Sequence, residues 1–320
     1  MNNFVLYSLY FIYSAFFLNK HRRIIKGKIL HQKEHENIAN YLENAYIKKY
    51  FENKLDDIQI KKTRNINGKK IIWQFWYQGI DNAPCIIKKC FKSVQKYKGN
   101  YEVVLLDKDN IKDYLIFPDF IYQKIDDKKF GEKTITIFSD LLRVSLLNNY
   151  GGIWLDAGMF LSGEIQKEIL DQDFFIFHRS TKKPQDYKNW INFNYNFFSW
   201  DEKFKVNIVN GFILSNKNNE IMKIMQDILI NYWKYENKLV YYFMFQILFD
   251  TLNKKYLNLN LNLYITNDTD IHLLQYHAKD KYSDKLWNDI KNKTSIHSLK
   301  IFKKIRKHSM IDKILFKDTI

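Results

Sequence analysis

The spacing of apolar residues changes twice between residues 136 and 162. Apolar side chains first recur at helical intervals, which predicts a helix, and two glycines after Tyr150 predict its end. A short apolar run then predicts a buried strand that ends at Asp156. In open α/β sheets ligands bind beyond the carboxyl ends of the strands, so we expect Asp156 to serve chemistry rather than packing. Asp140 and Arg143 share one face of the predicted helix and could point at the same crevice.

The same patterns predict alternating strands and helices along the rest of the chain. Dense β-type runs predict strands over 71–76 and 101–107, with a helix between them that ends near Tyr97. A strand, a helix and a second strand at this spacing favour a parallel crossover and a doubly wound sheet. We also expect strands at 174–177 and 208–214, helices near 220–233 and 239–252, and a loop over the aromatic and asparagine-rich stretch 187–200.

The N-terminal run 4–18 is uncharged and rich in aromatic residues, and a basic cluster follows it up to Lys28. It is shorter than the roughly 20 residues that cross a bilayer, and it lacks the flanks of a secretory signal. This favours a segment lying on an anionic membrane surface; a helix packed on the body or a short anchor are the alternatives. We therefore expect a membrane-associating segment over 1–28, a helical, solvent-facing connector over 29–66 and one catalytic domain over 67–320.

Charge narrows the choice of partner only in part. The chain has 51 Lys and Arg against 35 Asp and Glu, and its net charge of +16 favours anionic partners. A genomic bias toward Asn, Lys, Ile and Tyr would explain part of this excess. No zinc pattern or RNP-type motif accompanies it, so we expect no nucleic acid. Cys85 and Cys90 suit neither a disulfide nor a metal pair, and we expect reduced packing residues in a cytosolic protein.

Absent motifs exclude several enzyme classes. Neither GxGxxG nor GxxxxGK[ST] occurs, which argues against dinucleotide dehydrogenases and P-loop enzymes, and HExxH is also absent. The remaining chemical candidate is Asp140 with Arg143 and Asp156. Alone, the first two would be a surface ion pair worth about a few tenths of a kcal/mol. The glycine corner and the strand-end carboxylate beside them favour a functional site.

Four segments resemble, in order and spacing, the capsular polysaccharide synthesis proteins among the glycosyltransferases with the DXD sugar-binding motif, family 32. They are IIWQFWYQGIDNAP, YEVVLLD, FSDLLRVSLLNNYGGIWLDAGMFLS and SIHSLK, within roughly residues 69–300. The resemblance implies an α/β fold of the GT-A type, with a Rossmann-like, mostly parallel sheet flanked by helices. It also implies a nucleotide-sugar donor, Mn²⁺ or Mg²⁺, and retention of the anomeric configuration.

The resemblance also implies roles for residues of the metal and sugar sites. Asp140 and Arg143 would hold donor sugar hydroxyls and orient the donor, and Asp156 would bind the metal. His297 resembles the C-terminal histidine that completes the metal shell, and a structural role for this lone histidine is an equal alternative.

A second group of residues would contact the rest of the donor. Trp73, Gln74 and Trp76 would lie beside the nucleobase, where either indole could stack. Gly152 and Asn210 would also lie near the donor on the same resemblance.

Two positions depart from the family pattern. Gly158 stands where the wider family has the second acid of DXD, so metal binding would depend on Asp156, the donor diphosphate, water and His297. Tyr241 stands where we expect an acid, which points to a slow or differently specific enzyme. Both departures also suit a binding or assembly subunit that resembles a glycosyltransferase but has no activity.

The sequence therefore predicts a cytoplasmic glycosyltransferase, peripheral at the inner face of the plasma membrane. It would move a hexose from a nucleotide diphosphate sugar, most simply a UDP-sugar, to a saccharide or lipid-linked acceptor in capsular or surface polysaccharide synthesis. A divalent cation on carboxylate oxygens would orient and neutralise the leaving diphosphate. The aromatic stretch 187–200 could form an acceptor platform, and ordinary core and lid packing is equally expected.

Overall fold

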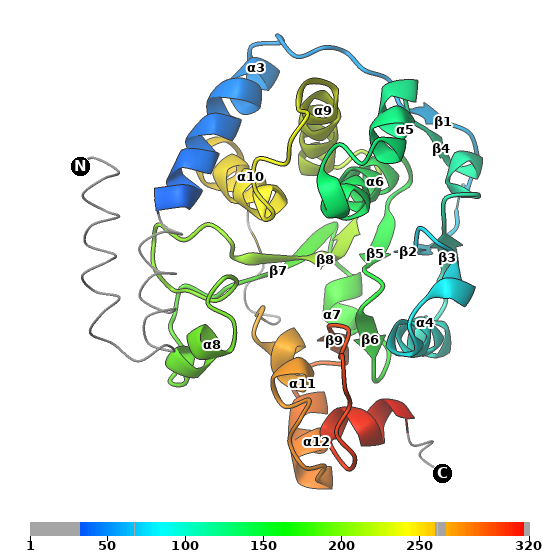
Figure 1. Cartoon of the computed structure of the whole chain (residues 1–320), viewed down its shortest axis with the longest axis vertical. Helices are drawn as coiled ribbons and strands as arrows, with labels where there is room; N and C mark the ends of the chain where they lie inside the picture. The colour runs from blue at the N-terminus through cyan, green and yellow to red at the C-terminus, as the bar shows by residue number, and fades with distance from the viewer. Residues whose placement is uncertain (1–32, 67, 260, 262–266, 317–320) are drawn as a thin grey trace.

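The computed structural model describes residues 33–66, 68–259, 261 and 267–316. Within them, helices pack on both faces of one central sheet (Figure 1). The predicted membrane segment 1–28 lies outside the described residues and stays a prediction.

The central sheet has five strands in the order β3-β2-β5-β8-β7. They are β2 (Ile71–Phe75), β3 (Glu102–Leu106), β5 (Gly152–Leu155), β7 (Phe174–His178) and β8 (Ile208–Ser215). β2 pairs in parallel with β3 and β5, whereas β8 runs antiparallel to β5 and β7. All five predicted strands are confirmed, and the result is a mixed α/β fold of the GT-A-like kind.

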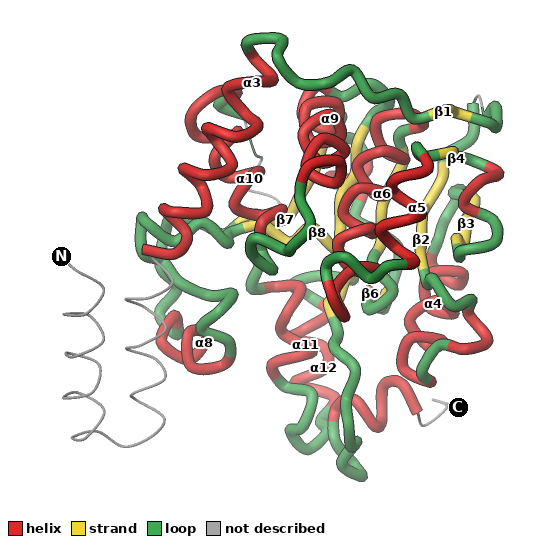
Figure 2. Tube along the Cα trace, turned by 45° about the horizontal axis from the view of Figure 1, so that its top comes forward, coloured by secondary structure: helices red, strands yellow, loops and turns green. Residues whose placement is uncertain are grey.

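Two layers of helices cover the sheet (Figures 1 and 2). One layer contains α5 (Asp119–Asp126), α6 (Thr134–Tyr150), α9 (Glu220–Tyr235) and α10 (Met244–Leu252). On the other side lie α4 (Cys85–Tyr97), α7 (Lys167–Leu170), α11 (Leu273–Tyr276), α12 (Asp284–Lys291) and an antiparallel pair, β6 (Met159–Leu161) with β9 (Ile296–Ser298). The shorter elements are α3 (Lys48–Phe51), α8 (Tyr187–Phe193), β1 (Lys61–Lys62), β4 (Leu115–Ile116), the 3-10 helices Ile80–Asn82, Ile111–Asp113, Gly131–Lys133 and Asp270–His272, and the π-helical turns Glu43–Ile47, Asn253–Leu257 and Asp312–Phe316.

Alternation along the central strands divides the core between the two layers. Trp73 and Trp154 lie on the face packed against α6 and α9, and Ile72, Ile153 and Leu155 lie on the face toward α4 and α7. Because both faces are covered, these strands are apolar almost throughout, which explains why a continuous apolar run predicted them.

The connector predicted over 29–66 is helical over residues 33–51, but it does not face solvent on all sides. Leu42, Tyr46 and Ile47 are buried in the same core cluster as α9 and α10. The helix therefore belongs to the body of the protein, because one apolar stripe among its charges is enough to bury a face.

Two further expectations need correction, and both concern aromatic segments. The stretch 187–200, expected as a loop, begins with helix α8, whose Trp190 and Ile191 are buried. The helix expected over 239–252 begins later, at Met244, after a turn in which Met244 N–H donates to Tyr241 O. Local spacing of apolar residues reveals neither boundary.

The cysteine pair is free, as predicted, but only Cys90 is a packing residue. Cys85 is exposed at the start of α4.

Candidate active site

Asp156 follows the last residue of β5 at the carboxyl edge of the sheet. Its N–H donates to Gly211 O at 2.8 Å, so the backbone here is still held by β8. Gly211 leaves room for the carboxylate, because a Cβ at that position would lie 2.9 Å from Asp156 Oδ2. The Asp156 side chain keeps 40% of its surface exposed and is therefore open to a ligand.

Asp140, Arg143 and Asp156, which were predicted to share one crevice, do lie together, and Arg143 connects the two carboxylates. It projects from α6, and its Nη2 lies 3.2 Å from both Asp140 Oδ1 and Asp156 Oδ1. The same guanidinium donates to Asn210 O at 2.6 Å and to the carbonyl and hydroxyl oxygens of Ser139, each at 3.2 Å. With its N–H groups used in this way, the buried guanidinium orients the carboxylates and has little surface left for a substrate.

Aromatic rings hold the Arg143–Asp156 pair from two sides. The guanidinium carbon lies 5.2 Å from the centre of the Trp154 ring and 5.5 Å from that of Phe245. Trp154 Nε1 also donates to Asp156 Oδ1 at 2.7 Å. One carboxylate oxygen of Asp156 is thus fixed by both an indole and a guanidinium, a charge-assisted arrangement that leaves the other oxygen without a hydrogen bond among the described residues.

Asp140 is buried behind Asp156. Its Oδ1 accepts a hydrogen bond from Asn210 Nδ2 at 3.1 Å, besides the ion pair with Arg143. Burial raises the pKa of Asp140 to about 7, the charge of Asp156 adds to this rise, and Arg143 and Asn210 oppose it. A carboxyl group with a pKa near neutrality and specific charged partners is typical of functional sites.

Helix α10 and the turn before it bring further side chains to this site. Gln246 Nε2 donates to Asn210 Oδ1 at 3.1 Å and thereby fixes which way the Asn210 amide faces. Tyr242 is 45% exposed, and the negative charges of Asp140 and Asp156 add to partial burial in raising the pKa of its phenol. These residues lie far from Asp156 in sequence, so no local spacing could reveal them.

Tyr241, the tyrosine that departs from the family pattern, packs against His35. Tyr241 hydroxyl lies 3.3 Å from His35 Nε2, and the two rings meet edge to face. Its neighbour Tyr242 is the one whose phenol senses the site carboxylates. The departure at Tyr241 therefore concerns packing against His35.

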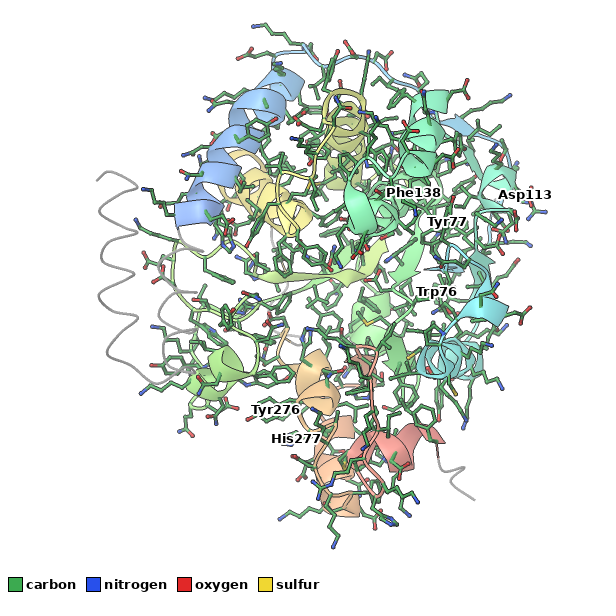
Figure 3. The ribbon with its side chains drawn as sticks, viewed as in Figure 1. Trp76, Tyr77, Asp113, Phe138, Tyr276 and His277 are labelled. Carbon is green, nitrogen blue, oxygen red and sulfur yellow. The ribbon has the colours of Figure 1, made fainter. Side chains whose placement is uncertain are left out.

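Of the residues predicted to bind the donor, Trp73, Gln74 and Gly152 lie within the sheet, whereas Trp76 lies past the end of a strand. Trp73 is fully buried and its Nε1 donates to Gly151 O at 2.9 Å, while Gln74 is also buried within β2. Gly152 lies at the amino end of β5 with φ +105°, where a Cβ would be 2.4 Å from a backbone oxygen of β2. Of the two indoles, only Trp76 lies past the carboxyl end of β2 and is partly exposed (Figure 3).

His297 lies on β9, which pairs with β6 directly downstream of Asp156. It is fully buried in β9, its Nε2 lies 2.8 Å from the hydroxyl of Ser162, and the rings of Phe160 and Trp287 flank it. Burial lowers the pKa of His297 to about 3, so the ring is neutral. Its Nδ1 has no hydrogen-bond partner among the described residues, and the metal-ligand role of His297 stays a prediction.

Gly158 has a structural reason to be glycine. A Cβ at this position would lie 2.4 Å from Leu299 O, and Leu299 N–H donates to Gly158 O at 2.9 Å. The approach of the C-terminal segment to the residue after β5 therefore takes the space that a second DXD acid would need.

The residues that remain fit a divalent cation with one protein ligand. Within the described part of the chain, the contacts of the Asp156 carboxylate involve Oδ1, and Oδ2 accepts no hydrogen bond. No group of three or more His, Cys, Asp or Glu residues suited to a metal occurs among the described residues. Mg²⁺ and Mn²⁺ keep several waters and bind through one or two carboxylates plus substrate phosphates, so a single free oxygen is sufficient.

None of the helices in the described ranges combines the length and the apolar character needed to cross a bilayer.

A mixed sheet with a fixed carboxylate at its carboxyl edge defines a class that includes the GT-A-type glycosyltransferases. The chain belongs to the capsular polysaccharide synthesis protein family, whose profile matches residues 23–314.

Three curated relatives carry glycosyltransferase names. O-glycosyltransferase braB of Annulohypoxylon truncatum is 31% identical over 111 residues, which is 32% of this chain and 25% of that protein. Glycosyltransferase afumC of Aspergillus fumigatus is 31% identical over 114 residues, 33% of this chain and 29% of that protein. O-glycosyltransferase PaGT of Phomopsis amygdali is 23% identical over 173 residues, 52% of this chain and 39% of that protein. The matches thus span well under half the length of each relative.

Proposed function

We propose that this protein is a metal-dependent, retaining glycosyltransferase with a DXD-like site. It transfers a hexose from a nucleotide diphosphate sugar, most simply a UDP-sugar, to a saccharide or lipid-linked acceptor in capsular or surface polysaccharide synthesis. The observation that carries the proposal is the exposed Asp156 carboxylate, fixed by Arg143 and Trp154 at the edge where α/β sheets bind ligands. Family membership and the three glycosyltransferase relatives support it.

The buried residues of the site act by positioning. Arg143 keeps Asp156 in one orientation, and Asp140 with Asn210 fixes Arg143 from behind. A preorganised carboxylate costs no rearrangement when the donor arrives, which is how such sites favour reaction. Sugar hydroxyls of the donor would approach the Asp156 carboxylate and the residues behind it from the solvent side. The partly exposed face of Trp76 would receive the nucleobase.

The cation, Mn²⁺ or Mg²⁺, would be held by Asp156 Oδ2 together with the donor diphosphate and water. When bound, it supplies positive charge that orients and neutralises the leaving diphosphate. Lys300 follows Leu299, whose N–H bonds to Gly158, and would add a second positive charge close to the same edge.

We also propose a peripheral position at the inner face of the plasma membrane. The support is the aromatic run 4–18 with its basic cluster up to Lys28, and the net charge of +16, which suits an anionic lipid surface.

A panel of nucleotide sugars tests the function directly. Donor hydrolysis is measured for each sugar with Mn²⁺, with Mg²⁺ and with a chelator. We expect turnover of one or a few donors, lost with the chelator and restored by added metal. Turnover that persists undiminished in the chelator would contradict the metal dependence.

The second candidate function is a glycosyltransferase-like binding or assembly subunit, which the missing second acid at Gly158 favours. The same panel separates the two, because a subunit of this kind would turn over no donor with any metal. Donor binding without turnover, measured by calorimetry, would support the subunit.

A further inference from the structure

A groove lies between helices α8 and α11, apart from Asp156. It has a volume of about 450 Å³ and is lined by Asn189, Asn192, Phe193, Tyr276 and Asp280. Figure 1 shows both helices beneath the sheet, and Figure 3 marks Tyr276 on the α11 side. The site chemistry described above does not use any of these residues.

The apolar part of the groove is a fixed aromatic surface. The ring centre of Tyr276 lies 4.9 Å from that of Trp190 and 5.2 Å from that of Phe193. Trp190 is buried, so it anchors the two partly exposed rings to the body of the protein. The electron-rich face of such a ring attracts the weakly positive C–H groups on one side of a pyranose.

The polar part of the groove can exchange hydrogen bonds with hydroxyl groups. Asn189 and Asn192 lie three residues apart on α8, are exposed, and their side chains form no hydrogen bond within the described ranges. Each amide offers donors and an acceptor, which suits neighbouring hydroxyls of a sugar. Asp280 accepts from His277 Nδ1 through Oδ2 at 2.7 Å, which leaves Oδ1 available.

The charge of the groove argues against a phosphate-bearing ligand. None of its five lining residues is basic, although Lys and Arg number 51 in the chain. An amide–carboxylate rim over an aromatic floor is suited to a neutral or amino sugar, and it would repel phosphate.

A short path of contacts links the groove to the Asp156 edge. Gln275, next to Tyr276, accepts from Lys300 N–H at 2.8 Å. The preceding residue Leu299 donates to Gly158 O at 2.9 Å, two residues past Asp156. The segment Leu299–Lys300 thus connects α11, which lines the groove, to the residue pair just past Asp156.

We propose that this groove is a saccharide subsite, which binds sugar units of the acceptor away from its reacting end. The proposal rests on the glycosyltransferase function and assigns the acceptor to the saccharide class. Recognition of distant sugar units supplies binding energy that positions the reacting hydroxyl without any contact at the donor.

The test uses the full chain and an array of short oligosaccharides, some neutral and some phosphorylated. We expect wild-type protein to bind at least one neutral oligosaccharide, and Tyr276→Ala to bind it about tenfold more weakly. The double variant Asn189→Ala/Asn192→Ala should weaken it severalfold, and these exposed side chains can be removed without unfolding the protein. Tyr235→Ala, at a 57% exposed tyrosine on α9 in the other layer, is the matched control and should bind as wild type.

Acceptor-independent hydrolysis of the donor separates this proposal from the function on which it rests. We expect all these variants to hydrolyse the donor at the wild-type rate. Unchanged binding in both groove variants, or no neutral oligosaccharide bound by a wild type that hydrolyses its donor, would overturn the subsite. Absence of donor hydrolysis in the wild type would count against the glycosyltransferase function.

Discussion

At the scale of single residues, burial makes the ionised form of Asp140 unfavourable in the folded protein. Burial raises its pKa from 3.8 to about 7, so the folded protein binds this proton more tightly than the unfolded chain does. Between these two values the native state holds more protons, and the free energy of unfolding falls as pH rises, by at most about 1.4 kcal/mol per pH unit. The contribution is most favourable at low pH and is lost as pH rises through 7.

Replacing this carboxyl group should therefore have an effect that depends on pH. We expect Asp140→Asn to gain stability relative to wild type between pH 5 and pH 8, because the amide has no charge to bury. Urea denaturation of both proteins at the two pH values measures this difference. Asp127→Asn, at a partly exposed acid, controls for the loss of one acid from the chain. An equal difference at both pH values would show that Asp140 is not held in its protonated form.

At the scale of elements, the central strands could be predicted from the sequence more accurately than the positions of the residues around them. Residues 71–75 and 153–155 are buried on both faces, and such runs are conspicuous in sequence. Asp140, Arg143 and Asp156 could be grouped because a helix and the strand after it are local. The burial of Trp73 and the position of Gly152 at the amino end of β5 could not be predicted, because they depend on how the strands pair.

The pairing of β6 with β9 was harder to predict, although it brings the C-terminal segment against Gly158 beside the site. Its strands are far apart in sequence, and only their contact shows why residue 158 is glycine. The same holds for Gln246 on α10 and Tyr242 in the turn before it, which come to the site from a distant part of the sequence.

Restoring the second DXD acid should harm this pair of strands. Gly158→Asp places a Cβ 2.4 Å from Leu299 O, and we expect a loss of about 1–3 kcal/mol in the free energy of unfolding. Gly163→Ala is the matched control at the other end of the pair, because its Cβ would meet Ser295 Cβ at an ordinary 3.5 Å. If Gly158→Asp is as stable as wild type and binds Mn²⁺ without a donor, the steric explanation is wrong.

At the scale of the whole molecule, the buried part of the N-terminal helix begins after the predicted membrane segment. Ala39, Leu42 and Ile47 pack in the main core, and all lie beyond residue 28. Removing residues 1–28 should therefore leave the body folded.

We expect this truncated protein to leave the membrane fraction, because the aromatic run and its basic cluster are gone. Fractionation measures its location, and donor hydrolysis, which should match the full chain, reports on the fold. A truncated protein that stays with membranes would contradict the surface segment.

In the function we propose, Asp156 holds the metal and the donor diphosphate at the carboxyl edge of the sheet. The most direct test of this role is metal-dependent donor hydrolysis by Asp156→Asn beside wild type, with thermal melting of both. Because the side chain is 40% exposed and an amide oxygen can still accept from Trp154, the variant should melt close to wild type. We predict loss of nearly all metal-dependent hydrolysis in this folded variant. Hydrolysis at the wild-type rate with the same metal requirement would remove Asp156 from the site and contradict the account.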